Sequence, residues 1–416
     1  MYSTFAPAGG FRFFRTRDPG IDTPGATRNG HGMNVLMVAA EMTPLAKVGG
    51  LADVVGALPA ALARRGHDVR VVLPCYADLA DQRLGPGAVA CDHRVPLRVG
   101  DRMRSLRYRT WADAPAGVTV DLVDVPGLFD RPGVYAGPDG VPFGDGPERW
   151  AALAQAALML PELADWPVDV LHAHDAQAAL VPVLRRQWYG DRSLPGPGGT
   201  LLTIHNLAHQ EQMAAGRAVR LGLPGHLVSY PGPLEFWGQA NLLKGGILTS
   251  DRVNTVSATY AREVITAPDL GCGLAGVLDS LGDRFGGIPN GVDHDVWDPA
   301  HDPHLDHGYG PDDLAGKTAC REALLAELAL DASPRPLLGM VSRLVPQKGL
   351  DLLMPLLDRL AAGGYALVVL GTGEARYHDQ LAAAAARHPG RVAFVGSFSE
   401  ALAHRIYAGC DAFLMP

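Results

Sequence analysis

Hydrophobic positions along the chain follow two alternating patterns: short continuous apolar runs, and longer stretches with helical periodicity. Residues 34–40 form a first apolar run, and the stretch 51–65 after it has apolar residues on one face of a helix. A second apolar run, 69–73, follows. A strand, a crossover helix and another strand in this order predict a parallel pair. We therefore predict a doubly wound α/β sheet, in which ligands bind at the carboxyl ends of strands.

The same alternation continues towards residue 286, with long irregular connections. Further predicted strands are 168–171, 200–204 and 252–256, and predicted helices are 149–164 and 259–266, with Ser257 as a helix cap. Residues 79–148 are richer in glycine, proline and charge, which predicts shorter strands and loops, with a surface loop at the end of 124–135. Residues 208–240 are predicted to be a short helix and loops.

A second α/β alternation starts after a cluster of turn residues near position 287 and a polar linker to about residue 312. Its predicted strands are 337–341, 366–370, 392–395 and 412–415, and its predicted helices are 313–329, 350–361, 375–387 and 399–408. Three segments are therefore expected: a disordered leader or mis-assigned start (1–32), a first domain (33–286) and a second domain (287–416). Met33, just before the first strand, is the natural beginning of the fold.

Composition narrows the class of protein. The 416 residues carry a net charge of −8, and no dense Lys/Arg block is present, which argues against nucleic acid as a partner. No apolar run is long enough to span a membrane. The cysteines are odd in number and lack CxxC spacing, which is typical of free thiols in a reducing cytoplasm; they are Cys75, Cys91, Cys272, Cys320 and Cys410.

Two glycine-containing loops follow predicted strands. In the first domain, Lys47, Gly49 and Gly50 stand between a strand and a helix, where free backbone N–H groups and a lysine suit an anionic ligand. The alternative is a tight turn whose glycines serve packing. In the second domain, Arg343 and Lys348 share one loop after a strand. The alternative is a solvated helix start, but the position after a strand favours a pyrophosphate site, which such a pair can hold.

The second domain has its own glycine loop beside that pair. Gly371 and Gly373 follow the strand 366–370, and they favour a phosphate-binding edge. In the first domain, polar residues follow two other strands: His172, His174 and Asp175 after one, and His205 after the next. We interpret them as the polar lining of a ligand site, because no third ligand at metal-binding spacing accompanies the two histidines.

Two further short patterns resemble metal sites. Asp293 and Asp295 form a DxD sequence, but within a turn at the domain junction. His301, His304 and His307 recur every third residue in the polar linker. Such short motifs are permissive, and we expect neither to bind a metal ion.

Six blocks, in order, resemble bacterial glycogen synthase and plant starch synthase. They are KVGGLADVVGALPAAL, HAHD, TIHNLAHQ, DRVNTVSATYAREV, GIPNGVDHDVWDP and VSRLVPQKGLDLL. The resemblance runs from Met33 to the last residue. It implies a retaining glucosyltransferase of the GT-B type, with two Rossmann-like domains and the site in the cleft between them. It also implies ADP-glucose as donor, the non-reducing 4-OH of an α-1,4-glucan such as glycogen as acceptor, no metal or other cofactor, and a cytoplasmic location.

The resemblance also implies residue roles. Arg343 and Lys348 would hold the leaving diphosphate, and Lys47, Gly49 and Gly50 would lie against the donor's phosphates and sugar. The remaining assigned residues would line or support the substrate pocket: His205, Asp175, Asn206, Asn290, Asp53 and Gln177, with Gly371 and Gly373 on the donor side.

Two departures from the family pattern leave alternatives open. The family usually has HAHDWH, whereas Ala176 and Gln177 stand here in place of the tryptophan and the last histidine. The family also continues after DAFLMP into a glutamate-containing loop, SRFEPCG, whereas this sequence stops at Pro416. We therefore expect an incomplete donor site that binds and turns over nucleotide-sugar weakly. The alternatives are a related transferase, such as one making sucrose phosphate from UDP-glucose, and a non-catalytic glucan- or nucleotide-binding fragment.

Overall fold

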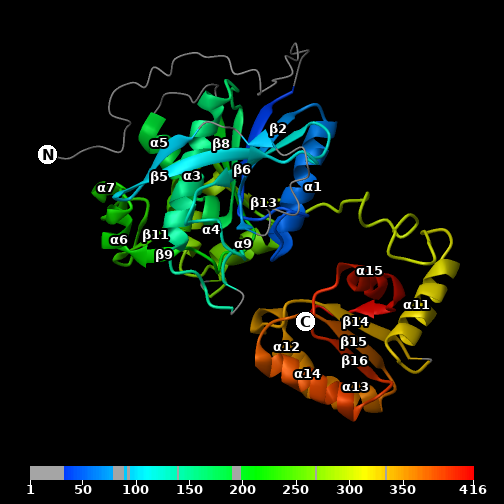
Figure 1. The fold of residues 1–416 in the computed structure, drawn as a ribbon. Helices are drawn as coiled ribbons and strands as arrows, with labels where there is room; N and C mark the ends of the chain where they lie inside the picture. The colour runs from blue at the N-terminus through cyan, green and yellow to red at the C-terminus, as the bar shows by residue number, and fades with distance from the viewer. Residues whose placement is uncertain are drawn as a thin grey trace. The chain divides into compact units, whose positions relative to one another are not determined.

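Two compact units make up the chain in the computed structural model, and they divide between Gly291 and Val292 (Figure 1). The structure describes residues 32–77, 89–90, 94–137, 140–189, 198–267, 269–332 and 335–416. The predicted leader lies outside these residues except for Gly32, and so does Cys91. The domain boundary expected at residue 287 falls a few residues before the division, because β13 (Phe285–Gly287) adds an edge strand to the first unit.

The main sheet of the first unit has ten strands among the described residues. Their order is β13-β12-β8-β7-β1-β2-β6-β5-β3, with β4 paired to β5. β1 pairs in parallel with both β2 and β7, so the predicted doubly wound sheet is confirmed. The other strand bounds are β1 Asn34–Val38, β2 Asp68–Pro74, β3 Val89–Ala90, β4 Val95–Val99, β5 Arg102–Thr110, β6 Val118–Asp124, β7 Val170–His174, β8 Gly199–Ile204 and β12 Arg252–Thr255.

Helices cover both faces of this sheet. Figure 1 shows α1 (Gly50–Arg64) on one side of it and α3 (Gly146–Leu163) with α5 (Leu180–Tyr189) on the other. The remaining helices of the unit are α4 Asp175–Ala178, α6 Ala215–Arg220, α7 Gly225–Val228, α8 Leu242–Thr249, α9 Ala258–Thr266, α10 Ala275–Asp279 and the 3-10 turn η1 Gly282–Arg284. The predicted cap of α9 is confirmed, because Ser257 Oγ accepts the N–H of Tyr260 at 3.2 Å.

For the middle of the first unit, one prediction was wrong and another holds only in part. Residues 79–148 contain full-length strands, because β6 pairs in parallel with β2 inside the sheet, and β5 is antiparallel beside it. The charged residues of β5 had suggested loops. They are compatible with a strand because β5 is only half-buried, so its charged side chains can reach solvent. The surface loop predicted at the end of 124–135 is present only in part: Asp130 and Pro132 are exposed there, but the chain turns inward at Leu128, Phe129 and Val134, which are buried.

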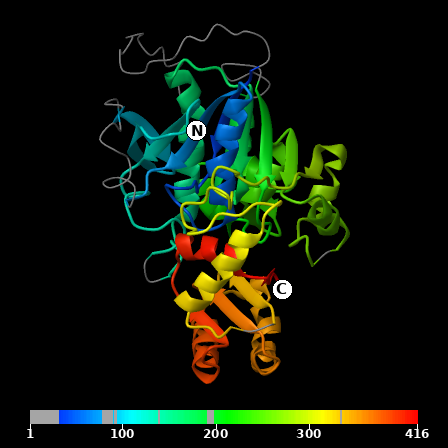
Figure 2. The ribbon, with the colours of Figure 1, turned by 90° about the vertical axis from the view of Figure 1, so that its right-hand side faces the viewer.

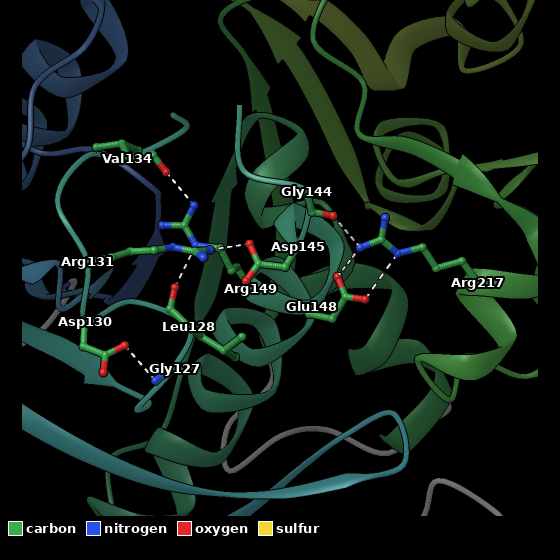
Figure 3. Close-up of polar contacts among 10 residues, drawn as sticks. All are labelled: Gly127, Leu128, Asp130, Arg131, Val134, Gly144, Asp145, Glu148, Arg149 and Arg217. Atoms are coloured by element: carbon green, nitrogen blue, oxygen red, sulfur yellow. Dashed lines mark hydrogen bonds and ion pairs between the residues drawn. The ribbon is translucent and has the colours of Figure 1, made fainter. Parts of the chain in front are cut away.

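Arg149 is the physical reason for that inward turn. Its guanidinium donates to the carbonyls of Leu128 (3.0 Å) and Val134 (2.6 Å), and it lies 5.5 Å from the Phe129 ring centroid (Figure 3). Ion pairs between Arg131 and Asp145 and between Glu148 and Arg217 flank this contact (Figure 3). Two carbonyls and an aromatic face replace part of the water that this buried guanidinium loses, and these contacts hold the segment against α3.

Residues 208–240 hold more structure than predicted. β9 (Gln212–Ala214), β10 (Glu235–Phe236) and β11 (Gln239–Asn241) form a small antiparallel sheet in the order β10-β11-β9. Strands of two or three residues are too short for an alternating pattern to be seen.

The second unit, coloured yellow to red in Figure 2, has a parallel sheet in the order β16-β15-β14-β17. Apolar cores lie on both faces of this sheet. Its strands are β14 Leu337–Val341, β15 Ala366–Leu370, β16 Val392–Val395 and β17 Ala412–Phe413. Its helices are α11 Ala315–Glu327, η2 Pro346–Lys348, α12 Leu350–Leu353, η3 Met354–Leu356, α13 Leu357–Ala362, α14 Ala375–Arg387 and α15 Glu400–Gly409. The predicted helix 350–361 is interrupted at η3, where Pro355 removes a backbone donor.

The polar linker after Gly291 folds against α15 of its own unit. Trp297 stacks on His404 with ring centroids 4.0 Å apart, and His404 Nδ1 lies 2.6 Å from a carboxylate oxygen of Asp302. The side chains of His404 and Asp302 are 2% and 6% exposed. His304 packs against the same imidazole, 4.8 Å between centroids. Of the predicted histidine series, His304 is thus used in packing, whereas His301 is exposed and forms an ion pair with Asp298. Nowhere in the described residues is there a helix long and apolar enough to cross a membrane.

Candidate functional site

Three imidazoles gather at the carboxyl ends of β7 and β8, which are neighbours in the sheet. Nδ1 of His174 lies 3.0 Å from Nε2 of His205, and the rings of His172 and His174 have centroids 4.1 Å apart. The two predicted strand ends that carry these histidines therefore lie side by side. We call His172, His174 and His205 the imidazole cluster.

A chain of hydrogen bonds fixes the tautomer of His172. Thr203 Oγ1 donates to Asn254 Oδ1 at 2.8 Å, so the same oxygen must accept from Nε2–H of His172, 2.7 Å away. His172 therefore carries its proton on Nε2 and is held at the base of the cluster. Such fixed donors keep the rings in one orientation.

The imidazole cluster is neutral around pH 7. Burial lowers the pKa of His172 to about 3, with a smaller contribution from His205. Burial also lowers the pKa of His205 to about 4 and that of His174 well below its usual value. A neutral imidazole both donates and accepts hydrogen bonds, which suits a ligand that carries hydroxyl groups.

Asp175 lies beside the cluster in a strained backbone conformation. Its φ is +57°, in the left-handed region, and its Oδ1 accepts the N–H groups of His205 (2.6 Å) and Asn206 (3.3 Å). Burial raises the pKa of Asp175 to about 7; the two backbone bonds lower it, and the Glu41 carboxylate adds to the rise. A carboxyl group poised near neutrality is typical of functional sites.

Glu41 connects Asp175 to the glycine loop, which we define as residues 47–50. Its Oε2 accepts the N–H groups of Val48 (2.7 Å) and Gly49 (2.8 Å), and its Oε1 accepts the hydroxyl of Tyr135 (2.6 Å). The sequence had suggested free amides at this turn. In the structure two of them are bonded to a carboxylate, so an incoming anion would compete with Glu41 for the N–H of Gly49.

The backbone of the glycine loop has open space around Gly49 and Gly50. Lys47 Nζ forms an ion pair with Asp53 Oδ1 at 2.7 Å, consistent with Asp53 supporting the loop. A Cβ atom added at Gly49 or Gly50 would meet nothing within 4 Å, and neither glycine has a positive φ. Packing therefore does not require either glycine, and open space above the backbone remains available to a ligand.

Gln177 and Asn206 complete this region. Gln177 lies in α4 and donates through Nε2 to Glu211 Oε1 at 3.2 Å. Glu211 adopts a positive φ of +52°, and burial raises the pKa of its carboxyl group. Asn206 Oδ1 accepts the N–H of Ala208, which closes the turn after β8.

The second unit presents two cations in the loop after β14, which we call the cationic loop (residues 342–349). Arg343 and Lys348 are both exposed. Within the part of the chain that the structure describes, neither side chain forms an ion pair. The cationic loop ends at Gly349, whose φ of +71° turns the chain into α12. Two exposed, unneutralised cations within one loop can bind an anion such as a diphosphate.

Packing explains the second glycine loop (residues 371–374). A Cβ atom on Gly371 would lie 1.8 Å from the carbonyl oxygen of Ser342, and one on Gly373 would lie 2.3 Å from that of Leu344. Gly373 also forms an isolated β-bridge with Leu344. The two glycines therefore let the second glycine loop press against the cationic loop and fix its backbone.

The remaining predicted residues stand apart from these groups. Asn290 is exposed after β13, close to the end of the first unit. Asp293 accepts the N–H of Asp295, as in an ordinary turn. Among the described residues, no three His, Cys, Asp or Glu side chains are grouped to hold a metal ion.

Two residues of this region were missed from the sequence. Glu41 stands three residues after the end of β1, directly after the apolar run 34–40, and a polar residue in that position is a signal that could have been used. Tyr135 could not have been found, because it reaches Glu41 only through the turn that Arg149 stabilises.

Comparisons with known proteins give a consistent result. Residues 34–280 match the family model described as "Starch synthase catalytic domain", and residues 329–416 match "Glycosyl transferases group 1". The chain is 43% identical over 385 residues to "Glycogen synthase 2" of Geobacter sulfurreducens, and 43% identical over 394 residues to "Glycogen synthase" of Alkalilimnicola ehrlichii. In both, the aligned part is 92% of this chain and 78% of the relative.

A solved structure shares the fold. The catalytic domain of starch synthase IV from Arabidopsis thaliana, bound to ADP and acarbose, matches with a TM-score of 0.84 and 32% identity. The match covers 93% of this chain and 78% of that chain.

Proposed function

The chain belongs to the glycogen and starch synthase family of glycosyltransferases, and from that premise we propose that it transfers glucose from ADP-glucose to an α-1,4-glucan. The glucose joins the 4-OH at the non-reducing end of the glucan with its α configuration retained. The observation that carries the proposal is the likeness over 93% of the chain to a starch synthase domain that binds ADP and acarbose.

The cationic loop is assigned to the leaving diphosphate. When the bond between the anomeric carbon and the diphosphate breaks, its electron pair stays on the phosphate oxygen and negative charge grows there. Arg343 and Lys348 are exposed and form no ion pair within the described residues, so they can stabilise that charge more than the ground state.

The imidazole cluster and Asp175 are assigned to the glucose. Neutral His205 offers a hydrogen bond to a sugar hydroxyl without competing for the positive charge that develops at the anomeric carbon. Asp175 fixes the turn that carries His205 and Asn206 by accepting both backbone N–H groups. The acceptor hydroxyl attacks from the face that the diphosphate leaves, and its proton departs with the phosphate.

Gln177 is assigned to the acceptor side of the same pocket. The hydrogen bond from its side-chain amide to Glu211 fixes the orientation of that amide, as a hydrogen bond would fix the imidazole of the histidine usual at this position. We also assign the protein to the cytoplasm, because Cys75, Cys272, Cys320 and Cys410 are free.

The test is a transfer assay with glycogen and either labelled ADP-glucose or UDP-glucose. We expect incorporation from ADP-glucose to exceed that from UDP-glucose by about tenfold or more. The labelled glucose should be released by an enzyme that cleaves α-1,4 bonds from non-reducing ends. The incorporation measured with the Arg343→Ala variant serves as the background of the assay. Absence of transfer above that background from either donor would overturn the proposal, and a preference for UDP-glucose would overturn its donor.

A further inference from the structure

The hairpin between β10 and β11 displays an exposed tryptophan. Trp237 is 87% exposed. All six tryptophans of the chain lie in described residues, and the other five are buried or partly buried. A large aromatic side chain normally buries most of its surface, so full exposure of one ring calls for a reason.

The backbone at Trp237 makes the exposure more unusual. Phe236 pairs with Gln239, so Trp237 and Gly238 form a two-residue turn, and their φ angles are +51° and +80°. Asn-Gly is the favoured sequence for a turn with two positive φ angles. A bulky aromatic residue in the left-handed region is an outlier, because its side chain strains the backbone there. Strain and exposure both oppose folding, so stability does not explain a tryptophan in this position.

The hairpin beneath the ring is fixed. The N–H of Gly238 donates to Glu235 Oε1 at 3.0 Å, and Lys244 Nζ donates to the carbonyl of Glu235. Phe236 contacts the Trp237 ring with centroids 6.4 Å apart at 65°. The indole is therefore presented from a rigid base, which lowers the entropic cost of binding.

The same hairpin is bonded to the segment that follows His205. β11 pairs with β9, the N–H of Leu242 donates to the carbonyl of Glu211, and Asn241 Nδ2 donates to Gln210 Oε1 at 2.6 Å. Trp237 thus belongs to the part of the first unit that continues directly from the imidazole cluster.

We propose that Trp237 is a glucan-binding residue, against which one glucose unit of the acceptor chain stacks away from the reacting end. The proposal rests on the proposed function, which supplies the class of polymer. The C–H face of a glucose ring is apolar and flat, so it fits an indole. Glu235 beside the ring and the net charge of −8 disfavour an anionic polymer such as nucleic acid.

A second contact of this kind acts through effective concentration. A glucan held at Trp237 keeps its other chain ends close to the enzyme, which lowers KM for a large acceptor without changing the chemical step. A short oligosaccharide held by the reacting pocket alone should gain nothing from it. Trp237 should therefore affect KM for glycogen and leave kcat unchanged.

The experiment compares wild type with Trp237→Asn in native gels that contain glycogen. Asparagine suits the turn, so the variant removes the ring without straining the backbone, and its melting temperature checks the fold. We expect glycogen to retard the wild type and the variant's Kd for glycogen to rise about fivefold to tenfold. The control is Val219→Gln, which removes an exposed apolar side chain of the neighbouring α6. Trp237→Phe should retain part of the binding.

Tryptophan fluorescence of the wild type provides a measurement that needs no variant. Because Trp237 is the exposed indole, glycogen should protect it from quenching by acrylamide. No protection, or equal glycogen binding by wild type and Trp237→Asn, would overturn the proposal, as would a loss shared equally by Val219→Gln. Its failure is distinct from that of the proposed function, since glycogen binding through Trp237 can persist in a chain that transfers no glucose.

Discussion

The two glycine loops of the molecule occupy equivalent places, each after a parallel strand, yet their glycines do different things. Gly49 and Gly50 have open space where a side chain would stand, whereas Gly371 and Gly373 touch the carbonyls of Ser342 and Leu344. The first loop keeps its cation, Lys47, in an ion pair with Asp53. The second glycine loop has no cation of its own. Arg343 and Lys348 belong to the neighbouring cationic loop, where they form no ion pair within the described residues.

The difference separates two ways of building an anion site. In the first unit, small residues leave the backbone open to a ligand. In this structure, the Glu41 carboxylate accepts the backbone N–H groups of Val48 and Gly49. In the second unit, the glycines are structural, and exposed side chains supply the charge. The same short motif therefore predicts a loop, but not which of its atoms a ligand meets.

The largest expected effect concerns the cations of the second unit. Arg343→Ala and Lys348→Ala should each lower kcat about 100-fold or more, because each removes charge stabilisation of the transition state. Steady-state rates with ADP-glucose and glycogen measure the effect. Arg359→Ala is the matched control, an exposed arginine on α13, the helix that leads into the start of β15. Unchanged turnover in both loop variants would remove the cationic loop from the site.

The next effect tests the glycines against each other. Gly371→Ala should destabilise the second unit by about 2–3 kcal/mol, because its Cβ cannot fit beside Ser342. Gly50→Ala should change stability by less than about 0.5 kcal/mol, since its surroundings are open. Urea unfolding measures both. If Gly50→Ala nevertheless lowers transfer activity, the open space is used by substrate; if the two variants were equally stable, the contrast between the loops would be wrong.

The smallest effect is a pH dependence that belongs to the first unit. His172 has a pKa of about 3 in the folded chain, below its value of 6.5 when unfolded, so the unfolded chain binds more protons between these values. Stability should therefore fall on acidification below pH 6.5, by up to about 1.4 kcal/mol per pH unit for this residue.

His172→Gln should reduce that slope by the same amount, because the amide can still donate to Thr203. Urea unfolding at pH 5 and pH 6 measures it, with the exposed His226 changed to Gln as control. Asp175 acts in the opposite direction, since its pKa of about 7 makes stability fall as pH rises from about 4 to 7. An unaltered slope in His172→Gln would show that its imidazole is not held neutral.

The sequence predicted what local patterns determine. α14 spans Ala375–Arg387 as predicted, and Ser257 caps α9, because helix periodicity and capping depend on neighbours along the chain. The meeting of His174 and His205 also followed from topology, since adjacent parallel strands end at one edge.

The sequence could not predict contacts that depend on distant carbonyl groups. A lone arginine in an apolar helix would be placed in solvent, yet Arg149 is buried because Leu128 and Val134 supply acceptors. Trp237 was missed for a related reason, since a hairpin whose strands have two and three residues has no pattern from which to predict an exposed turn.

The packing of the linker on α15 has a consequence for recombination between relatives. Because Trp297 and Asp302 contact His404, the linker is structurally part of the second unit. A chimera joined near residue 312 would combine one parent's linker with another parent's α15 and lose these contacts. The natural joint for exchanging donor modules is therefore the peptide bond between Gly291 and Val292.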